Sequence, residues 1–235
     1  LMGKLTFDLS EVVTKTTAGI IVLPADHYLV NRTKRSTESK NRIGKSACDQ
    51  CSYCTEFCPR YLLGYDVQPH KVMRSLGFST TGQAVWNQYA DLCCSCGLCS
   101  LYACPEDLYP REACDQGKVE NKKNGTRYEQ QKPVKVHPIK EGRRVPLKQL
   151  MKRIDVLKYD AHTPYTKNSP NPSQVKILLK QHMGVSAKPV VRLGDVVHEG
   201  TLIGDIEEGV LGARVHSSIP GRVTHVSDEF IRIAK

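Results

Sequence analysis

CDQCSYCTEFCP, residues 48–59, and CCSCGLCSLYACP, residues 93–105, are the most informative stretches of this 235-residue chain. In the first, two, two and three residues separate the successive cysteines, and a proline follows the last one. The second repeats this spacing with one extra residue before Cys104. This is the spacing of bacterial ferredoxins, in which three close thiolates hold one face of a 4Fe–4S cube. The sequence therefore predicts two 4Fe–4S clusters.

Zinc is the main alternative to iron–sulfur, because zinc sites with four cysteines also use pairs of cysteines two residues apart. Zinc sites rarely place three cysteines in succession at this spacing, and neither run has a suitably spaced histidine. The pattern favours iron–sulfur over zinc.

The fourth cysteine of each run is expected to serve the other cluster, as it does in ferredoxins with two clusters. The repeat of Cys-Pro at Cys58 and Cys104 supports this crossing. We therefore expect two ligand sets: Cys48, Cys51, Cys54 and Cys104 for the first cluster, and Cys93, Cys96, Cys99 and Cys58 for the second.

Two further cysteines, Cys94 and Cys114, fall outside these sets. We expect each to be a small buried hydrophobic residue, with a third metal site or a redox thiol as the alternative. Four apolar side chains flank the ligands and are expected to exclude water from the clusters: Tyr53, Phe57, Leu62 and Leu98.

Composition indicates a protein of a reducing compartment, with the cytoplasm as the expected location. All ten cysteines lie between residues 48 and 114, whereas a secreted disulfide scaffold would spread them along the chain. No signal peptide and no apolar run of bilayer length is expected. The net charge of +10 partly offsets the negative clusters, so it is not assigned to nucleic acid.

Short strands are expected near the N-terminus, at residues 5–7 and 16–24, because β-branched residues are enriched there. Residues 31–47 are basic and polar, which favours a solvated linker, with docking of an acidic partner as the alternative. Helices are predicted from Pro69 to residue 76, over residues 83–92, and from Pro110 to residue 123.

The C-terminal half changes character twice. Residues 129–172 are rich in Lys, Pro and Asn and are expected to be an extended connector with one short helix near residues 147–157. From residue 173, short apolar runs separated by Gly and Asp predict a small all-β sandwich or barrel. The expected fold class is therefore α+β and multidomain, with helices around the clusters and β modules at both ends.

Several segments resemble the RnfC-like family. LMG (1–3) and VTKTTAGI (13–20) resemble the end of its β-grasp (SLBB) region, and the cysteine runs resemble its helical ferredoxin domain. The tail resembles its barrel-sandwich hybrid domain, through LKQHMG (179–184), GDVV (194–197), GTLIG (200–204) and VHSSIPGRV (215–223). The resemblance implies four regions: 1–30 β-grasp, 31–128 ferredoxin, 129–172 linker and 173–235 barrel-sandwich.

The order of these regions resembles the PduS-type cobalamin reductases of bacterial microcompartments, which are oxidoreductases. That resemblance implies an N-terminal half, missing from this chain, that binds FMN and NADH. Electrons would pass from this flavin through both 4Fe–4S clusters to cobalamin, to an adenosyltransferase or to another redox protein. A microcompartment shell protein is a further expected partner. Flavin contacts within this chain are not assigned.

The chain itself is expected to relay electrons without catalytic residues, since it has no nucleotide-binding motif and no catalytic dyad. The tail also resembles biotinyl and lipoyl carriers, but the turn at residues 209–213 lacks the lysine that would bear a cofactor, which favours a docking module. Two alternatives remain: an Rnf-type electron-transport subunit, and a non-enzymatic metal-bearing interaction module. Nucleic acid is not expected as a partner, because residues 31–47 contain no aromatic residue to stack on bases.

Overall fold

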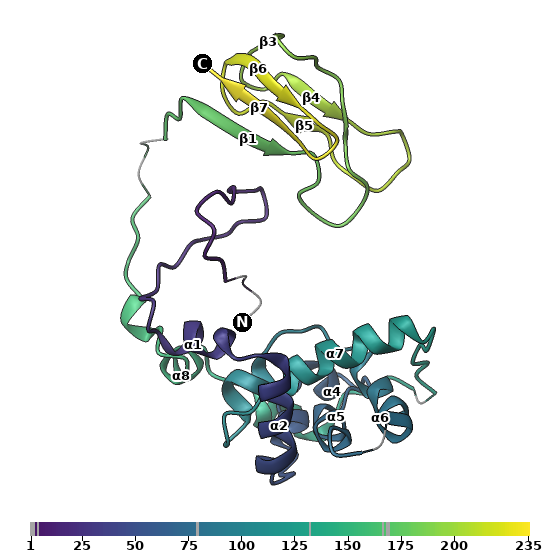
Figure 1. Ribbon diagram of the computed structural model, residues 1–235. Helices are drawn as coiled ribbons and strands as arrows, with labels where there is room; N and C mark the ends of the chain where they lie inside the picture. Colours follow the sequence, from purple (N-terminus) through teal and green to yellow (C-terminus); the bar gives the residue numbers. More distant parts are fainter. Residues whose placement is uncertain (1–2, 4, 79, 132, 166, 168–169) are drawn as a thin grey trace. The chain divides into compact units, whose positions relative to one another are not determined.

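The computed structural model describes residues 3, 5–78, 80–131, 133–165, 167 and 170–235 (Figure 1). The chain divides into two compact units, one consisting mainly of Leu23–Ala161 and the other of Thr6–Val22 with His162–Lys235. The first unit is helical and contains all ten cysteines, and the second is a β structure. The expected mixture of helix and sheet is confirmed, with the two kinds in separate units.

The first unit is built from short helices joined by the two cysteine loops. Its α-helices are α1 (Tyr28–Lys34), α2 (Thr37–Ala47), α3 (Tyr53–Glu56), α4 (Pro59–Leu62), α5 (Pro69–Ser75), α6 (Thr80–Asn87), α7 (Pro110–Lys123) and α8 (Leu147–Arg153). Among the residues that the structure describes, it is completed by the 3-10 turns Gln88–Ala90, Pro138–Arg143 and Leu157–Tyr159 and the π-helical turn Cys99–Ala103.

The helices predicted between and after the cysteine runs are confirmed. Both α5 and α7 begin at a proline, whose fixed φ and missing N–H suit the first turn of a helix. The helix predicted over residues 83–92 is α6, which begins three residues earlier and continues into the turn Gln88–Ala90. The core of the unit lies between α5 and α7 and consists of Val72, Met73, Leu76, Ala90, Cys104, Leu108, Ala113 and Cys114.

The expectation of a solvated linker at residues 31–47 is wrong, because this stretch forms most of α1 and all of α2. Arg32, on α1, is only 8% exposed and donates hydrogen bonds of 2.7 Å to the carbonyl oxygens of Asp107 and Leu108. Its guanidinium also lies 4.3 Å from the ring centre of Tyr109. Hydrogen bonds and an aromatic face replace the water that a charged side chain would otherwise require.

The segment 129–161, expected to be part of an extended connector, instead packs within the first unit. The backbone N–H of His137 donates to the carbonyl oxygen of Leu62 at 3.0 Å. Leu150, Ile154 and Val156 form a second small core with side chains that include Leu23, Leu29, Leu98, Leu101 and Tyr102. The polar composition of the segment concealed three well-placed apolar residues.

Over its described residues the second unit forms two antiparallel sheets, in agreement with the predicted all-β tail. One has the strand order β1-β7-β6-β3, from β1 (Gln174–Leu178), β7 (Phe230–Ala234), β6 (Gly221–Val226) and β3 (Val196–Val197). The other has the order β2-β4-β5, from β2 (Lys188–Pro189), β4 (Leu202–Asp205) and β5 (Val215–His216). The core consists of Leu179, Ala187, Val197, Ile203, Val215, Ile219, Val223, Ile231 and Ile233.

The strands expected at residues 5–7 and 16–24 are not formed; among the described residues before α1, none lies in a strand. Residues 6–22 belong to the second unit, where the Lys15 backbone N–H donates to Oε1 of Gln181 at 2.9 Å. β-branched residues adopt a strand only where a neighbouring strand pairs with them. Here the contact is made by a side chain instead.

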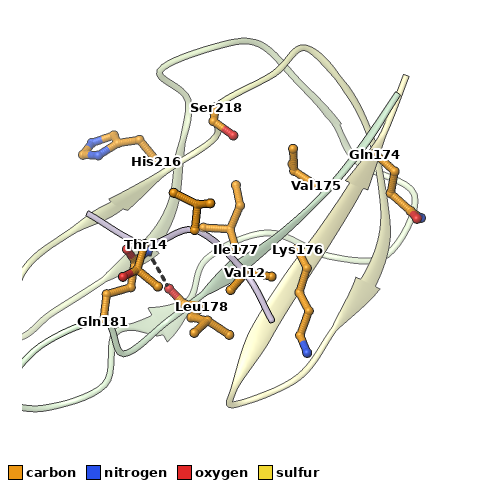
Figure 2. A pocket seen from close by; sticks show the side chains of 11 residues that line it. Val12, Thr14, Gln174, Val175, Lys176, Ile177, Leu178, Gln181, His216 and Ser218 are labelled. Atoms are coloured by element: carbon orange, nitrogen blue, oxygen red, sulfur yellow. Dashed lines mark hydrogen bonds between the residues drawn. The ribbon is translucent and has the colours of Figure 1, made fainter. Parts of the chain in front are cut away.

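An open pocket of about 420 Å³ lies in the second unit, between this N-terminal segment and β1. In Figure 2, Val12 and Thr14 lie beside β1, and a dashed line marks the 3.1 Å hydrogen bond from Nε2 of Gln181 to the carbonyl oxygen of Leu178. This bond fixes the Gln181 side chain, whose Oε1 accepts the hydrogen bond from the Lys15 backbone N–H. The pocket therefore reflects how the N-terminal segment docks on the β unit.

Candidate iron–sulfur centre

The first cysteine loop connects α2 to α3. Two of its non-glycine residues have left-handed backbone conformations, Gln50 with φ of 59° and Ser52 with φ of 66°. Such residues reverse the chain between successive cysteines at a conformational cost. The loop is therefore held in a shape that brings three cysteines close together.

A pocket at this loop brings a fourth cysteine to the same place. It is lined by Cys48, Cys51 and Cys54 of the first run and by Cys104 of the second, with Asp49, Gln50, Ser52, His70, Met73, Leu108 and Pro110 around them. Burial raises the pKa of the Cys54 thiol, and the neighbouring Cys104, Cys48 and Cys51 thiols raise it further. The four cysteines expected for the first cluster thus surround one pocket.

The second cysteine loop repeats the backbone shape of the first. Ser95 has φ of 55° and Gly97 has φ of 82°. These positions correspond to Gln50 and Ser52, two residues after the first cysteine and one residue after the second. The sequence repeat is therefore also a repeat of left-handed backbone positions.

The extra residue before Cys104 is absorbed by the π-helical turn Cys99–Ala103. The backbone N–H of Cys104 donates to the carbonyl oxygen of Cys99, five residues earlier, at 3.2 Å. In the first loop the Phe57 backbone N–H bonds four residues back to Tyr53, at 3.0 Å, as in an α-helix. A π-turn holds one more residue than an α-turn, so Cys104 can follow a longer spacer.

Cys58 of the first run lies among the cysteines of the second. Burial raises the pKa of the Cys58 thiol to about 12, and the nearby Cys93 and Cys96 thiols contribute to the rise. Hydrogen bonds from the backbone N–H groups of Tyr61 and Arg60 act in the opposite direction and lower this pKa. Burial also raises the pKa of Cys99, with Cys54, Cys93, Cys58 and Cys96 as charged neighbours. Cys58 therefore lies near Cys93 and Cys96 of the second expected set, and Cys99 lies near Cys54 as well as near members of its own set.

The donor set fits an iron–sulfur cube. Within the described residues, no three His, Cys, Asp or Glu side chains converge tightly enough for one metal ion. A 4Fe–4S cube is larger than a single ion and therefore holds its four thiolates further apart. Thiolate sulfurs are the ligands that these clusters use, and each group here supplies four.

Exposure differs among the proposed ligands. Cys54, Cys58, Cys99 and Cys104 are buried and Cys48, Cys93 and Cys96 are half-buried, whereas Cys51 is exposed. The first loop thus opens to solvent at Cys51.

The two remaining cysteines contact the second loop. Cys114, on α7, has no exposed surface, so its expected burial is confirmed. Its thiol hydrogen-bonds Cys93 and is the main cause that lowers the pKa of Cys93 to about 6, against the effect of burial. Cys94 is half-buried rather than buried, and its side chain hydrogen-bonds Cys96.

Aromatic and apolar packing around the sites follows the expectation in part. Leu62 is buried, and Phe57 and Leu98 are half-buried. The Phe57 ring lies 5.6 Å from that of Tyr102, edge to face, which links the segments that precede Cys58 and Cys104. Tyr53 is 44% exposed and so shields its site incompletely, because it begins α3 at the surface.

Sequence analysis missed His70 and three arginines. His70, whose Nδ1 lies 2.7 Å from Oγ1 of Thr55, lines the first pocket, and burial lowers its pKa. Arg32 holds the backbone after Cys104, Arg153 donates to the carbonyl oxygen of Cys104 at 3.3 Å, and Arg143 pairs with Glu56 at 2.6 Å. All three arginines lie in basic stretches, and no local pattern distinguishes them from solvated charges.

Comparison with known proteins first defines the class of each unit. Residues 47–109 match the 4Fe–4S dicluster domain, and residues 153–234 match the RnfC barrel sandwich hybrid domain. The chain therefore carries a ferredoxin-like domain for two 4Fe–4S clusters, followed by an RnfC-type β domain.

Whole-chain similarity then indicates a particular kind of protein. Over its full length the chain is 32% identical to a protein of Salmonella typhimurium and 31% identical to one of Citrobacter freundii, both named cobalamin reductase PduS. It spans about half of each, 52%. A shorter stretch, 32% of this chain and 16% of the relative, is 35% identical to one component of a proton-translocating ferredoxin:NAD(+) oxidoreductase complex of Clostridium ljungdahlii. The resemblance to PduS-type cobalamin reductases, seen in the sequence, is confirmed.

Proposed function

We propose that this chain binds two 4Fe–4S clusters with crossed ligands and relays electrons between them. Cys48, Cys51, Cys54 and Cys104 hold the first cluster, and Cys93, Cys96, Cys99 and Cys58 hold the second. One observation carries this proposal: Cys104, 50 residues beyond Cys54 in sequence, lines the same pocket as the first three cysteines. The match to the dicluster domain supports the same assignment.

The clusters, when bound, accept and release single electrons. The protein contributes the thiolates and the packing around them. Phe57, Leu62, Leu98 and Tyr102 limit the access of water. The exposed Cys51 places the first cluster nearest to a partner, so we infer that electrons are exchanged with the acceptor at this loop.

The wider reaction that we propose is reduction of cobalamin. Both relatives that match this chain over its whole length are named cobalamin reductases, and the chain corresponds to about half of each. NADH and FMN would then be bound outside these residues, and electrons would leave through this chain to cobalamin, to an adenosyltransferase or to another carrier. Location in the cytoplasm, within or attached to a microcompartment shell, belongs to the same proposal.

Metal and sulfide analysis tests the cluster assignment. After anaerobic purification we expect about eight iron and eight sulfide per chain. Reduction with dithionite should produce an EPR signal of two interacting S = 1/2 centres. Stoichiometric zinc without sulfide, in protein never exposed to air, would refute the proposal and favour a metal-bearing interaction module.

Mixing experiments test the acceptor. The chain is reduced with dithionite, freed of excess reductant by anaerobic gel filtration, and mixed with hydroxocobalamin. We expect cob(II)alamin to form as the cluster absorbance returns to its oxidised value, with chain stripped of iron as the control. If reduced clusters leave cobalamin unchanged but reduce a ferredoxin, the acceptor is a protein carrier.

A second candidate is an Rnf-type electron-transport subunit, favoured by the 74-residue match to a component of the Clostridium ljungdahlii complex. In this chain the RnfC-type domain follows the dicluster domain. No helix in the described part of the chain is both long and apolar enough to span a bilayer. Co-purification with membrane-embedded Rnf proteins from the native host would favour this candidate over cobalamin reduction.

A further inference from the structure

The basic stretch before the first cysteine loop lies beside the more exposed of the two proposed cluster sites. Helix α2 ends directly before Cys48. Its Gly44 packs against α5, where a β-carbon on the glycine would lie 3.0 Å from Cε of Met73 and 3.2 Å from Cδ1 of Leu76. The lack of a side chain at this position lets the two helices approach each other closely. The crossing of α2 and α5 therefore lies next to the start of the loop that contains Cys51.

Three exposed cations lie at this crossing. Arg42 and Lys45 are three residues apart on α2, so they share one side of the helix. Arg74 lies on α5, and its Nε donates to Oε1 of Gln50 at 2.7 Å. Gln50 immediately precedes the exposed Cys51, so Arg74 connects the helix crossing to the open part of the loop.

These cations have no acidic partner among the residues that the structure describes. The hydrogen bond of Arg74 goes to a neutral amide, which leaves its charge uncompensated. The stretches 41–54 and 69–75 together hold four Lys and Arg residues against one acidic residue, Asp49. At the second loop, by contrast, Asp115 lies 3.0 Å from Arg111 and 3.3 Å from Lys118. Cations near the second loop are therefore paired, and those near the first are not.

We propose that the surface formed by Arg42, Lys45 and Arg74 binds an acidic electron-carrier protein, which exchanges electrons with the first cluster at the loop of Cys51. This inference rests on the proposed function, because it requires a cluster in the first site. One electron passes from the reduced cluster to the oxidised carrier, and no bond forms or breaks.

Electrostatic attraction supports an acidic partner at this surface. Exposed charges attract a partner of opposite charge and speed its approach. The unit that carries the clusters adds to this attraction, because residues 23–161 contain 23 Lys and Arg residues against 15 Asp and Glu residues. The docked carrier would lie next to Cys51, which is the exposed ligand of the first site.

The test measures how fast the loaded full chain reduces two carriers of opposite charge. The chain is reduced with dithionite, freed of excess reductant, and mixed by stopped flow with plastocyanin, an acidic blue-copper protein, or with cytochrome c, a basic haem protein. With plastocyanin we expect the second-order rate constant to fall about tenfold as the ionic strength rises from about 20 to about 200 mM. With cytochrome c it should stay level or rise over the same range.

Two double charge reversals then locate the effect. Arg42→Glu with Lys45→Glu should lower the low-salt rate constant for plastocyanin about tenfold and raise that for cytochrome c. Lys122→Glu with Lys123→Glu makes the same change in net charge at the exposed last turn of α7, and should change either rate constant by less than about twofold. Arg74 is kept, because it also bonds the loop. Iron content and far-UV circular dichroism verify that each variant is folded and loaded.

Three results would overturn the inference and leave the proposed function intact. A rate constant for plastocyanin that does not depend on salt would show that charge does not guide docking. Equal losses in the two double variants would show that the net charge of the chain attracts the carrier, and not this surface. Binding of duplex DNA that only Arg42→Glu with Lys45→Glu abolishes, with reduction of plastocyanin unchanged, would assign the surface to nucleic acid. Wild-type chain without two clusters would instead refute the proposed function.

Discussion

The two cysteine loops share a backbone plan but differ in how they end. Both place left-handed residues at the same two positions, although the side chains there are Gln50 and Ser52 in one loop and Ser95 and Gly97 in the other. The first loop ends in the short helix α3, and the second ends in a π-turn. The shape needed to gather three thiols is thus strictly repeated, whereas the spacer before the fourth varies, because a helical hydrogen bond can shift by one residue.

Their surroundings differ as well. The first loop opens to solvent at Cys51, and the second is closed by α7 through Cys114 and Lys118. One sequence pattern has therefore been placed in two environments. Hydrogen bonds to the sulfurs and solvent exposure help to set the potential of an iron–sulfur cluster, so the loops offer two sites with the same ligands in which to compare these effects.

Replacing the fourth cysteine of either run with serine gives the largest expected effect. In Cys58→Ser the second cluster should be lost and the first retained, so that iron falls from about eight to about four per chain. Cys104→Ser should remove the first cluster instead. Iron analysis and EPR of the remaining centre measure this, and Cys94→Ala, which changes a cysteine outside both proposed sets, should keep all the iron.

The opposite result would contradict the proposed crossed ligation. If Cys58→Ser removed the cluster of Cys48, Cys51 and Cys54, each run would hold its own cube.

The left-handed positions supply the next test. Gly97→Val places a β-branched side chain at φ of 82°, which costs roughly 1–3 kcal/mol and should empty the second site in part. Ser52→Gly is the matched change in the first loop and should relieve strain at φ of 66°. Iron content and the rate of cluster loss in air measure both. Equal effects of the two substitutions would show that the loops do not share a backbone plan.

The sequence predicts the local features of this molecule well. Cysteine spacing predicted that Cys48, Cys51 and Cys54 would line one pocket, because the loop geometry is encoded within a dozen residues. Pro69 and Pro110 predicted where α5 and α7 begin, because a proline at the first turn acts locally.

What the sequence did not predict depends on distant partners. Arg32 is buried only because the backbone after Cys104 lies beside it, and no pattern within residues 31–47 reveals this. Leu150 and Ile154 pack against Leu98 and its neighbours, so a segment that is polar on average still contributes a core. The same holds for Cys114, whose contact with Cys93 spans 21 residues.

Arg32 should stabilise the second cysteine loop by more than its charge alone would. In Arg32→Leu the carbonyl oxygens of Asp107 and Leu108 lose their donors inside the protein, at a cost of about 2–4 kcal/mol. Arg32→Lys keeps the charge but cannot reach both oxygens with a planar fork, so it should recover only part of this. The urea midpoint of the loaded chain, followed by far-UV circular dichroism, measures the loss. Full stability of Arg32→Leu would show that the basic stretch is solvated, as its composition first indicated.

The smallest expected effect is on the first loop, at Arg143. Its guanidinium pairs with Glu56 at 2.6 Å and lies 5.2 Å from the ring centre of Phe57, but both members of the pair are about one-third exposed. Arg143→Ala should therefore lower stability by only about 0.5–1 kcal/mol. Arg144→Ala is the matched control, because Arg144 pairs with Glu141 where both side chains are 68% exposed, and it should change the urea midpoint less. If Arg143→Ala cost as much as Arg32→Leu, the first loop would depend on residues 129–161 as strongly as the second depends on α1, and the contrast between an open and an enclosed loop would no longer hold.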